Sequence, residues 1–356
     1  MDFGVFILAQ QRGYHQAPQD VIRNAVEQTV AAEAAGFTNA WYAEHHFNNY
    51  SLSPSPLMMV AHCAGLTKTI RLGTAVCILP LYHPNRLLAE IGFADVVSNG
   101  RLDLGVGSGY QQFEFDRFNV KIEESGEIYN EILDVIELGL AERSFSYDGK
   151  HIQIPPTSIA VRTLQKRLPI WITSGNPTAL ARGARDGHNM FVTALLNGTD
   201  AIKSLRDKIE GVATSVNKPV EALPFGFLRC AFASENDSEV QSYLDNARFQ
   251  RRISESLKLR KAQSEDGYMV KEMPAQNDPT PEQLYANLPV GSVNRVIDRM
   301  LEEISILKPT HIAIQTQLGD FDQKTMLKQI ELWGEKIIPA IRRELGSQKP
   351  AASEAA

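Results

Sequence analysis

One short stretch of the sequence gathers side chains that could move protons, Trp41-Tyr42-Ala43-Glu44-His45-His46-Phe47. The apolar run from Thr38 to Ala43 predicts a buried strand, so Glu44, His45 and His46 would lie where that strand leaves the core. Strand ends are where ligand sites collect in parallel α/β proteins. Adjacent residues of a strand point to opposite faces, so the two imidazoles cannot clamp one metal ion as a helical pair four residues apart can. The alternative is a pair of histidines satisfied by backbone groups at a loop or helix start.

A second stretch, from Gly73 to Pro80, is rich in small residues and is followed by Leu81-Tyr82-His83-Pro84. Small side chains at a strand end would let a flat ligand approach the backbone closely. A tightly packed barrel strand would use the same residues to fill its layers. The sequence leaves both interpretations open.

A third stretch, from Gly100 to Tyr110, predicts a strand that ends in a glycine-dense turn with one hydroxyl, Ser108. Such a turn offers backbone N–H groups to an anion. Glycines stand at every second position from Gly105 to Gly109, and no glycine or alanine follows where a dinucleotide fingerprint needs one. The pattern therefore excludes a Rossmann site.

A fourth stretch, from Ile172 to Ala179, predicts a strand that runs into a helix. The helix would begin with Ser174, Asn176 and Thr178, and a helix start with hydroxyls and unpaired N–H groups suits a phosphate. An ordinary helix cap, with Asn176 before Pro177, is the alternative.

Eight strand-like runs without polar alternation would position these four stretches. The runs are Phe3–Ala9, Thr38–Ala43, Leu72–Leu79, Leu102–Gly107, Ile170–Thr173, Asn189–Thr193, Phe225–Ala233 and His311–Gln315. They alternate with amphipathic helices such as Asp20–Ala35, and eight is the strand count of a (β/α)8 TIM barrel. The last helix would turn Leu327, Ile330, Ile337 and Ile338 towards the core before Pro339.

Two segments interrupt the alternation. Phe145 to Ile154, around Asp148-Gly149, predicts a small hairpin with a primed turn. The polar, proline-rich segment from Lys261 to Pro289 predicts a lid or a merely mobile insertion at about residues 261–290. We expect a single domain over residues 1–346 and a disordered tail over residues 347–356.

Composition narrows the class of protein. The chain has 356 residues, of which 43% are hydrophobic and 22% charged, and its formal net charge is -6. The sequence has no basic cluster and no apolar run of membrane length, so we expect no nucleic-acid or membrane partner, and we expect no secretory signal. Cys63, Cys77 and Cys230 lack metal-ligand spacing, which predicts reduced thiols, a cytoplasmic location and no metal site.

In this order the four stretches resemble the bacterial luciferase-like flavin monooxygenase family, and the resemblance runs from Met1 to about Glu344. The residues that carry it are Phe3-Gly4-Val5-Phe6, Ala34-Ala35-Gly36-Phe37 before Trp41, Glu44-His45-His46-Phe47, Gly73-Thr74-Ala75 to Leu79-Pro80, His83-Pro84, Gly100-Arg101 to Gly105, Pro289-Val290-Gly291-Ser292 and Ile337-Ile338-Pro339.

The resemblance implies a barrel with an insertion, a homodimer, and reduced FMN at the C-terminal mouth, supplied by a separate NAD(P)H-dependent flavin reductase. Reduced flavin would react with O2 to give a C4a-peroxide that passes one oxygen atom to a small organic substrate. By position, His45 would be the general acid/base, and we expect Glu44 and His46 to orient it. Ala75 and Val76, at a non-proline cis peptide, would lie under the isoalloxazine. The residues expected at the ribityl phosphate are Ser108, Gly109, Tyr110, Ser174, Gly175, Asn176 and Thr178.

The chain departs from luciferase itself at two turns. Gly107-Ser108 stands where luciferase has Cys-Arg, so a phosphate-binding arginine is missing, and Gly175-Asn176 replaces Glu-Ser. Both changes argue against light emission from a long-chain aldehyde. Two alternatives on the same barrel remain, an F420-dependent hydride-transferring oxidoreductase and a non-catalytic luciferase-type partner subunit. An enzyme that acts on sugars or phosphate esters would need a carboxylate pair or a metal cluster, and this sequence shows neither.

Overall fold

A computed structural model describes residues 1–347 and shows a closed ring of parallel strands. In order round the ring they are β1 (Asp2–Ile7), β2 (Asn39–Tyr42), β3 (Arg71–Thr74), β5 (Leu102–Gly107), β8 (Ile170–Thr173), β9 (Asn189–Leu195), β10 (Phe225–Cys230) and β15 (His311–Gln315). β15 pairs with β1 and β3 pairs with β5, so the ring has no open edge. The (β/α)8 barrel predicted from the sequence is confirmed.

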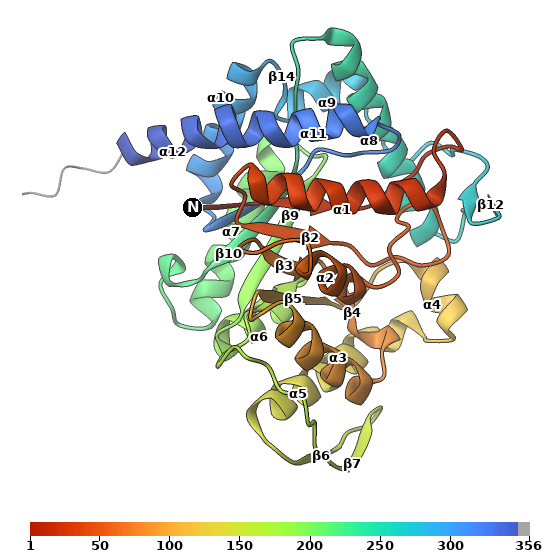
Figure 1. The fold of residues 1–356 in the computed structure, drawn as a ribbon, viewed down its shortest axis with the longest axis vertical. Coiled ribbons are helices and arrows are strands. Elements are labelled where there is room, and N and C mark those ends of the chain that lie inside the picture. Colours follow the sequence, from red (N-terminus) through yellow and green to blue (C-terminus); the bar gives the residue numbers. More distant parts are fainter. Residues whose placement is uncertain (348–356) are drawn as a thin grey trace, which may run out of the picture.

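Helices surround this ring (Figure 1). They are α1 (Pro18–Ala34), α2 (Pro56–Ala64), α3 (Pro84–Val97), α5 (Ser125–Ala141), α6 (Pro177–Asp186), α7 (Thr199–Ser215), α10 (Val293–Leu307) and α11 (Gln323–Leu332), which continues into α12 (Ile338–Ser347). Additional helices are α4 (Gln112–Phe118), α8 (Asp237–Lys258) and α9 (Pro281–Asn287). None of the helices within residues 1–347 has the length and apolar character needed to cross a membrane.

Local sequence explains where many helices begin. Five of them, α1, α2, α3, α6 and α9, start with a proline, whose missing N–H would have no partner in a first turn. Side chains cap others: Asn236 accepts from the N–H of Ser238 at the start of α8, and Asp322 accepts from the N–H of Thr325 in α11. The starts of these helices are therefore set by prolines and capping residues that can be recognised in the sequence.

Two predicted strands are shorter in the structure than in the sequence analysis. The run Leu72–Leu79 is divided into β3 and β4 (Cys77–Ile78) by a cis peptide between Ala75 and Val76. The run Phe225–Ala233 is divided too, because β10 ends at Cys230 and β11 (Phe232–Ala233) leaves the barrel to pair with β14 (Val290–Gly291). Unbroken apolar character reports burial, and it does not report which strand is the partner.

Three further predictions concern the hairpin, the last helix and the C-terminal tail. The hairpin is confirmed as β6 (Phe145–Asp148) and β7 (Gln153–Thr157), but four residues, and not two, connect its strands. The last helix continues past Pro339, and a π-helical turn over Trp333–Ile337 lies where the missing proline N–H would interrupt the α-helical bonds. The predicted tail lies outside the described residues, apart from Ser347 at the end of α12.

Large rings and glycines fill the inside of the barrel. Trp41 packs edge to face against Trp171 and Phe191, with ring centroids 5.2 Å away in both cases. A Cβ atom on Gly73 would stand 2.3 Å from the Trp41 ring, and one on Gly226 would stand 2.8 Å from the Phe191 ring. Gly73 is therefore a packing residue, as one of the two interpretations of its stretch predicted.

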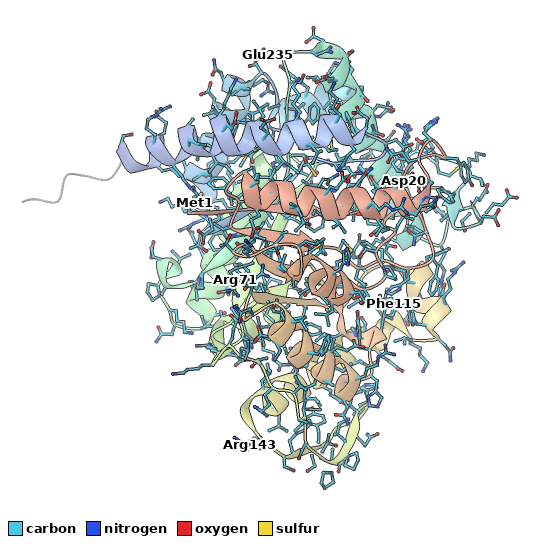
Figure 2. All side chains as sticks on the ribbon, viewed as in Figure 1. Met1, Asp20, Arg71, Phe115, Arg143 and Glu235 are labelled. Atoms are coloured by element: carbon cyan, nitrogen blue, oxygen red, sulfur yellow. The ribbon has the colours of Figure 1, made fainter. Side chains whose placement is uncertain are left out.

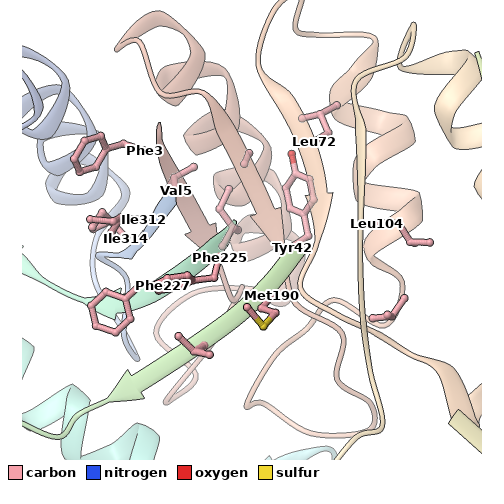
Figure 3. Packing of buried hydrophobic residues seen from close by; sticks show 14 of the residues in the cluster. Phe3, Val5, Tyr42, Leu72, Leu104, Met190, Phe225, Phe227, Ile312 and Ile314 are labelled. Carbon is pink, nitrogen blue, oxygen red and sulfur yellow. The ribbon is translucent and has the colours of Figure 1, made fainter. Parts of the chain in front are cut away.

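A separate apolar layer joins the outside of the barrel to the helices. Figure 3 shows part of it, with Phe3 near Ile312 and Ile314, and Tyr42 near Leu72. The strands run from one side of the molecule to the other: Met1 and Arg71, which mark their amino ends, lie opposite Phe115 of α4 in Figure 2. The carboxyl ends, which we call the mouth, therefore lie on the side of α4 and of β12 (Ser264–Glu265) (Figure 1).

Candidate active site

His45 lies just beyond the end of β2 and is held by a carboxylate from α4. Its ring nitrogen Nδ1 is 3.0 Å from Oε1 of Glu114, and the same oxygen accepts the backbone N–H of His46 at 2.7 Å. Glu114 is fully buried, and His45 is 8% exposed. A carboxylate beside Nδ1 keeps the proton on that nitrogen, so Nε2 is the atom that can accept or release a proton.

Two tyrosines complete the surroundings of His45. The Tyr50 ring stands edge to face against the imidazole at 4.7 Å, and the Tyr110 ring does so at 6.0 Å. The two hydroxyls are 3.4 Å apart, and burial raises the pKa of Tyr50 well above its usual value. Tyr110 is 43% exposed, so this group of side chains reaches solvent at the mouth.

Glu44 and His46 face elsewhere. Oε1 of Glu44 is 2.9 Å from Nε2 of His46, and Oε2 accepts from the Tyr82 hydroxyl at 2.6 Å. Both side chains line a cavity of about 470 Å³ beside α2 and α3, together with Tyr82, Arg86 and Phe93. Within residues 1–347 neither side chain forms a hydrogen bond with the His45 imidazole, whose hydrogen-bond partner is Glu114.

Glu114 is not evident as a site residue from the sequence, because 69 residues separate it from His45. The available signal was weak: a single carboxylate inside the apolar pattern Phe113-Glu114-Phe115. A buried charge within a short apolar helix usually has a specific partner, but the pattern does not say which.

The stretches expected at the flavin come together at neighbouring strand ends. β4 pairs with the end of β5, and a Cβ atom on Gly107 would stand 2.9 Å from Cγ2 of Val76. Ala75, Val76, Ser108 and Gly109 are all half-buried. The backbone of one stretch thus lies directly against the glycine turn of the other, and both remain accessible.

The turn before α6 lies next to them, because β8 pairs with β5. Asn176 caps the helix by accepting the N–H of Thr178 at 2.9 Å, so the cap interpretation is confirmed, and its own N–H donates to Oγ of Ser174 at 3.0 Å. Gly175, Asn176 and Thr178 are exposed. The ammonium of Lys208 on α7 donates to the carbonyl of Gly175 at 2.9 Å, which places a positive charge at this turn.

The segment from Lys261 to Pro289 lies across the mouth, together with α8. The Tyr268 hydroxyl donates to Oε1 of Gln11 at 2.7 Å, and the N–H of Met269 donates to Oδ1 of Asn49 at 3.1 Å. Glu272 pairs with Arg12 at 2.8 Å. These partners belong to the loops that follow β1 and β2, so the segment is attached to the rim around His45.

One group of possible metal ligands occurs within residues 1–347, Glu137, Asp186 and His188. Arg182 forms ion pairs with both carboxylates, and Nε2 of His188 is 2.5 Å from Glu137. The group lies at the amino ends of the strands, opposite the mouth, and its charges are paired with one another.

Residues 1–307 match the family model described as luciferase-like monooxygenase. The chain is 62% identical to the uncharacterized protein y4vJ of Sinorhizobium fredii, over 97% of this chain and 99% of that protein. It is 25% identical to the oxygenase component of the flavin-dependent trigonelline monooxygenase of Acinetobacter baylyi, over 84% of this chain and 85% of that protein.

Solved structures share the fold. The monooxygenase RslO1 of Streptomyces bottropensis has a TM-score of 0.82 at 19% identity, over 96% of this chain and 99% of that chain. The oxygenating constituent of 3,6-diketocamphane monooxygenase from Pseudomonas putida, in complex with FMN, has a TM-score of 0.77 at 19% identity, with 96% and 99% coverage. An F420-dependent secondary alcohol dehydrogenase has a TM-score of 0.76 at 16% identity, with the same coverage.

Proposed function

The chain belongs to the luciferase-like monooxygenase family, and we propose that it is the oxygenase component of a two-component system that uses reduced FMN and O2 to insert one oxygen atom into a small organic substrate. The observation that carries the proposal is the His45–Glu114 pair, which stands at the same barrel mouth as the accessible turn of Ser108 and Gly109. The named relatives support it, since one is an oxygenase component and another contains FMN.

The residues at the mouth fit FMN. Ala75 and Val76 would support the ring system, because both are only half-buried while Gly105 and Gly107 let β5 pack closely against this stretch. Ser108, Gly109 and Tyr110 would meet the ribityl chain, and Ser174, Gly175, Asn176 and Thr178 would meet its phosphate through a helix start. Lys208 would supply the positive charge that the missing arginine does not.

When bound, reduced FMN supplies the electrons with which O2 is divided between substrate and water. His45 exchanges a proton at Nε2 with the reacting groups, while Glu114 keeps Nδ1 protonated and the ring in place. α8 and the segment 261–289 serve as a lid that keeps water out; the contacts of Tyr268 and Glu272 with the rim hold it closed. This division leaves oxygen chemistry to the cofactor and proton transfer to the protein.

Two partners belong to the proposal. One is an NAD(P)H-dependent flavin reductase in a reducing, cytoplasmic setting, which the three free and buried cysteines Cys63, Cys77 and Cys230 suit. The other is a second copy of the chain. Met58 of α2 is 72% exposed and Phe93 of α3 is 56% exposed, and because both line the cavity beside α2 and α3 they offer an apolar surface for the second copy. Light scattering of the protein as it leaves a size-exclusion column would give twice the chain mass for a homodimer.

Cofactor choice tests the proposal against the hydride-transferring alternative. Anaerobic titration of the protein with reduced FMN, and separately with reduced F420, compares the two affinities under one set of conditions. We expect reduced FMN to bind and F420 to bind far more weakly. Binding of F420 alone, or of neither cofactor, would overturn the proposed function.

A further inference from the structure

The tip of the lid segment lies against the loop that carries His45. The segment contains a small hairpin of β12 and β13 (Tyr268–Met269), which we call the lid hairpin. Its turn residues Asp266 and Gly267 both have positive φ, as a tight hairpin turn requires. A Cβ atom on Gly267 would stand 3.8 Å from the backbone oxygen of Phe47, which is two residues after His45. The hairpin therefore touches the same loop as the candidate base.

Two buried amide side chains receive the lid hairpin. Oδ1 of Asn49 accepts the N–H of Met269 at 3.1 Å, and Oε1 of Gln11 accepts the Tyr268 hydroxyl at 2.7 Å. Asn49 is fully buried, and Gln11 is 1% exposed. An amide offers a donor as well as an acceptor, and Nδ2 of Asn49 donates to the backbone carbonyl of Gln11 at 2.8 Å. One side chain thus joins the lid hairpin to the loops that follow β1 and β2.

The neighbouring Asn48 uses its amide differently. Its Nδ2 donates to the carbonyl of His46 at 2.6 Å and its Oδ1 accepts the N–H of Tyr50 at 2.9 Å, so both bonds stay within the loop. Asn49 gives both of its side-chain atoms to other segments. Because 220 residues separate Asn49 from Met269, their bond exists only while the lid hairpin is docked.

The loop is built so that a displacement at Asn49 reaches His45. The N–H of His45 donates to the carbonyl of Ser53 at 3.1 Å, which closes the loop at its base. The carbonyl of Asn49 accepts the N–H of Gln11, also at 3.1 Å. Tyr50, the next residue, places its ring edge to face against the His45 imidazole at 4.7 Å. Docking of the lid hairpin therefore fixes the residue beside the one that packs on the imidazole.

We propose that Asn49 is a positioning residue that links closure of the lid to the placement of His45, so that the docked hairpin and the ordered loop form one state. This link rests on the proposed function, because closure matters to the chemistry only where the mouth holds reduced flavin. It goes further by naming the residue through which closure reaches the proton-transfer group. Such coupling is reciprocal: a change in the loop must loosen the hairpin, and a change in the hairpin must loosen the loop.

Hydrogen exchange followed by mass spectrometry measures both sides of this link in the full chain without flavin. The peptide that contains Met269 reports opening of the lid hairpin, and the peptide that contains the N–H of His45 reports opening of the loop. Exchange detects openings that are too rare to populate a second structure, so a small change in docking is visible. A thermal melt of each variant shows whether the whole fold has changed.

Variants are made on each side of the contact. Asn49→Ala removes both amide bonds and should speed exchange of the lid hairpin about tenfold, although no lid residue is changed. Tyr268→Phe combined with Glu272→Gln loosens the lid from its own side and should speed exchange of the loop severalfold, although no loop residue is changed. Asp116→Asn is the matched control, because its pair with Arg260 of the lid segment is exposed, and it should change either rate less than about twofold.

The outcomes separate the link from the proposed function. Unchanged hairpin exchange in Asn49→Ala with an unchanged melt overturns the role of Asn49. Faster hairpin exchange in the lid variant with unchanged loop exchange overturns the link, and this variant decides alone if Asn49→Ala does not fold. A protein that shows the link but binds no reduced FMN overturns the proposed function and supports the link. A protein that binds reduced FMN without the link overturns this inference alone.

Discussion

Two histidines occupy the same barrel in opposite settings. His311 lies inside the barrel at the start of β15, at the closed end that we call the floor. Its Nε2 accepts the indole N–H of Trp41 at 2.9 Å, and burial lowers its pKa to about 3. His45 lies at the mouth, where Glu114 stands beside Nδ1. The buried His311 ring has no carboxylate beside it and stays neutral, whereas the carboxylate of Glu114 fixes the His45 ring through Nδ1. The comparison shows that the partner, and not burial, separates a packing histidine from a candidate base.

The largest expected effect follows removal of the mouth imidazole. His45→Ala should lower substrate turnover by about 100-fold to 10,000-fold, the usual contribution of a general acid or base, with little change in melting temperature. His46→Ala is the matched control, because the neighbouring ring bonds to Glu44 and faces the cavity beside α2. Steady-state turnover with FMN reductase present measures both. Equal losses in the two variants would contradict the assignment.

The second-largest effect should follow loss of the Glu114 carboxylate. Glu114→Gln keeps the size of the side chain but removes the charge that holds Nδ1, so turnover should fall by about 10-fold to 100-fold while FMN affinity is unchanged. Glu44→Gln, the carboxylate that the sequence motif favours, should change turnover less than about threefold. A pH profile of kcat in each variant checks the cause, and a profile unaltered in Glu114→Gln would argue that Glu114 is only structural.

Substitution of a glycine should cost more stability at the floor than at the mouth. Gly73→Ala forces a Cβ atom to within 2.3 Å of the Trp41 ring, and it should cost about 1–3 kcal/mol of unfolding free energy. Gly175→Ala meets nothing within 4 Å and lies at exposed backbone, so its cost should stay below about 0.5 kcal/mol. Urea unfolding of both variants decides, and similar costs would mean that the floor is not tightly packed.

Lys208 offers a smaller test of the mouth. Lys208→Ala removes the positive charge at the turn before α6 and should weaken FMN binding by about 1 kcal/mol, roughly fivefold. Riboflavin, which has no phosphate, should bind the variant and the wild type equally. Flavin fluorescence titrations with both compounds separate a phosphate contact from a general loss of structure, which would weaken both.

The smallest effect concerns the floor histidine and pH. His311 has a pKa of about 3 when folded against an ordinary value of 6.5, so the unfolded chain takes up the proton first as pH falls. Stability is therefore lost below the unfolded pKa, by about 1 kcal/mol from pH 6.5 to pH 5.5 for this group. His311→Gln should lose that much less over the same interval. Identical pH slopes for the two proteins would show that His311 does not carry this penalty.

Much of the fold was predictable, since each barrel strand is a continuous apolar run and the helices carry prolines and caps at their starts. Neither the break at Ala75 nor the departure of Phe232 from the barrel could be predicted, because an apolar run does not identify its neighbour. At the site, the motif around His45 was visible, but its partner Glu114 was not. Glu44, adjacent in sequence, was the natural candidate, and only the fold shows that its side chain turns to Tyr82.

We propose that this mouth holds reduced FMN beside His45 and shields its reaction with oxygen. The most direct measurement mixes the protein anaerobically with reduced FMN, adds O2, and follows the return of the oxidised-flavin absorbance in a stopped-flow instrument. We expect this return to be delayed well beyond that of free reduced FMN, and we expect wild type and His46→Ala to share the delay. Reoxidation as fast as that of the free cofactor would contradict it.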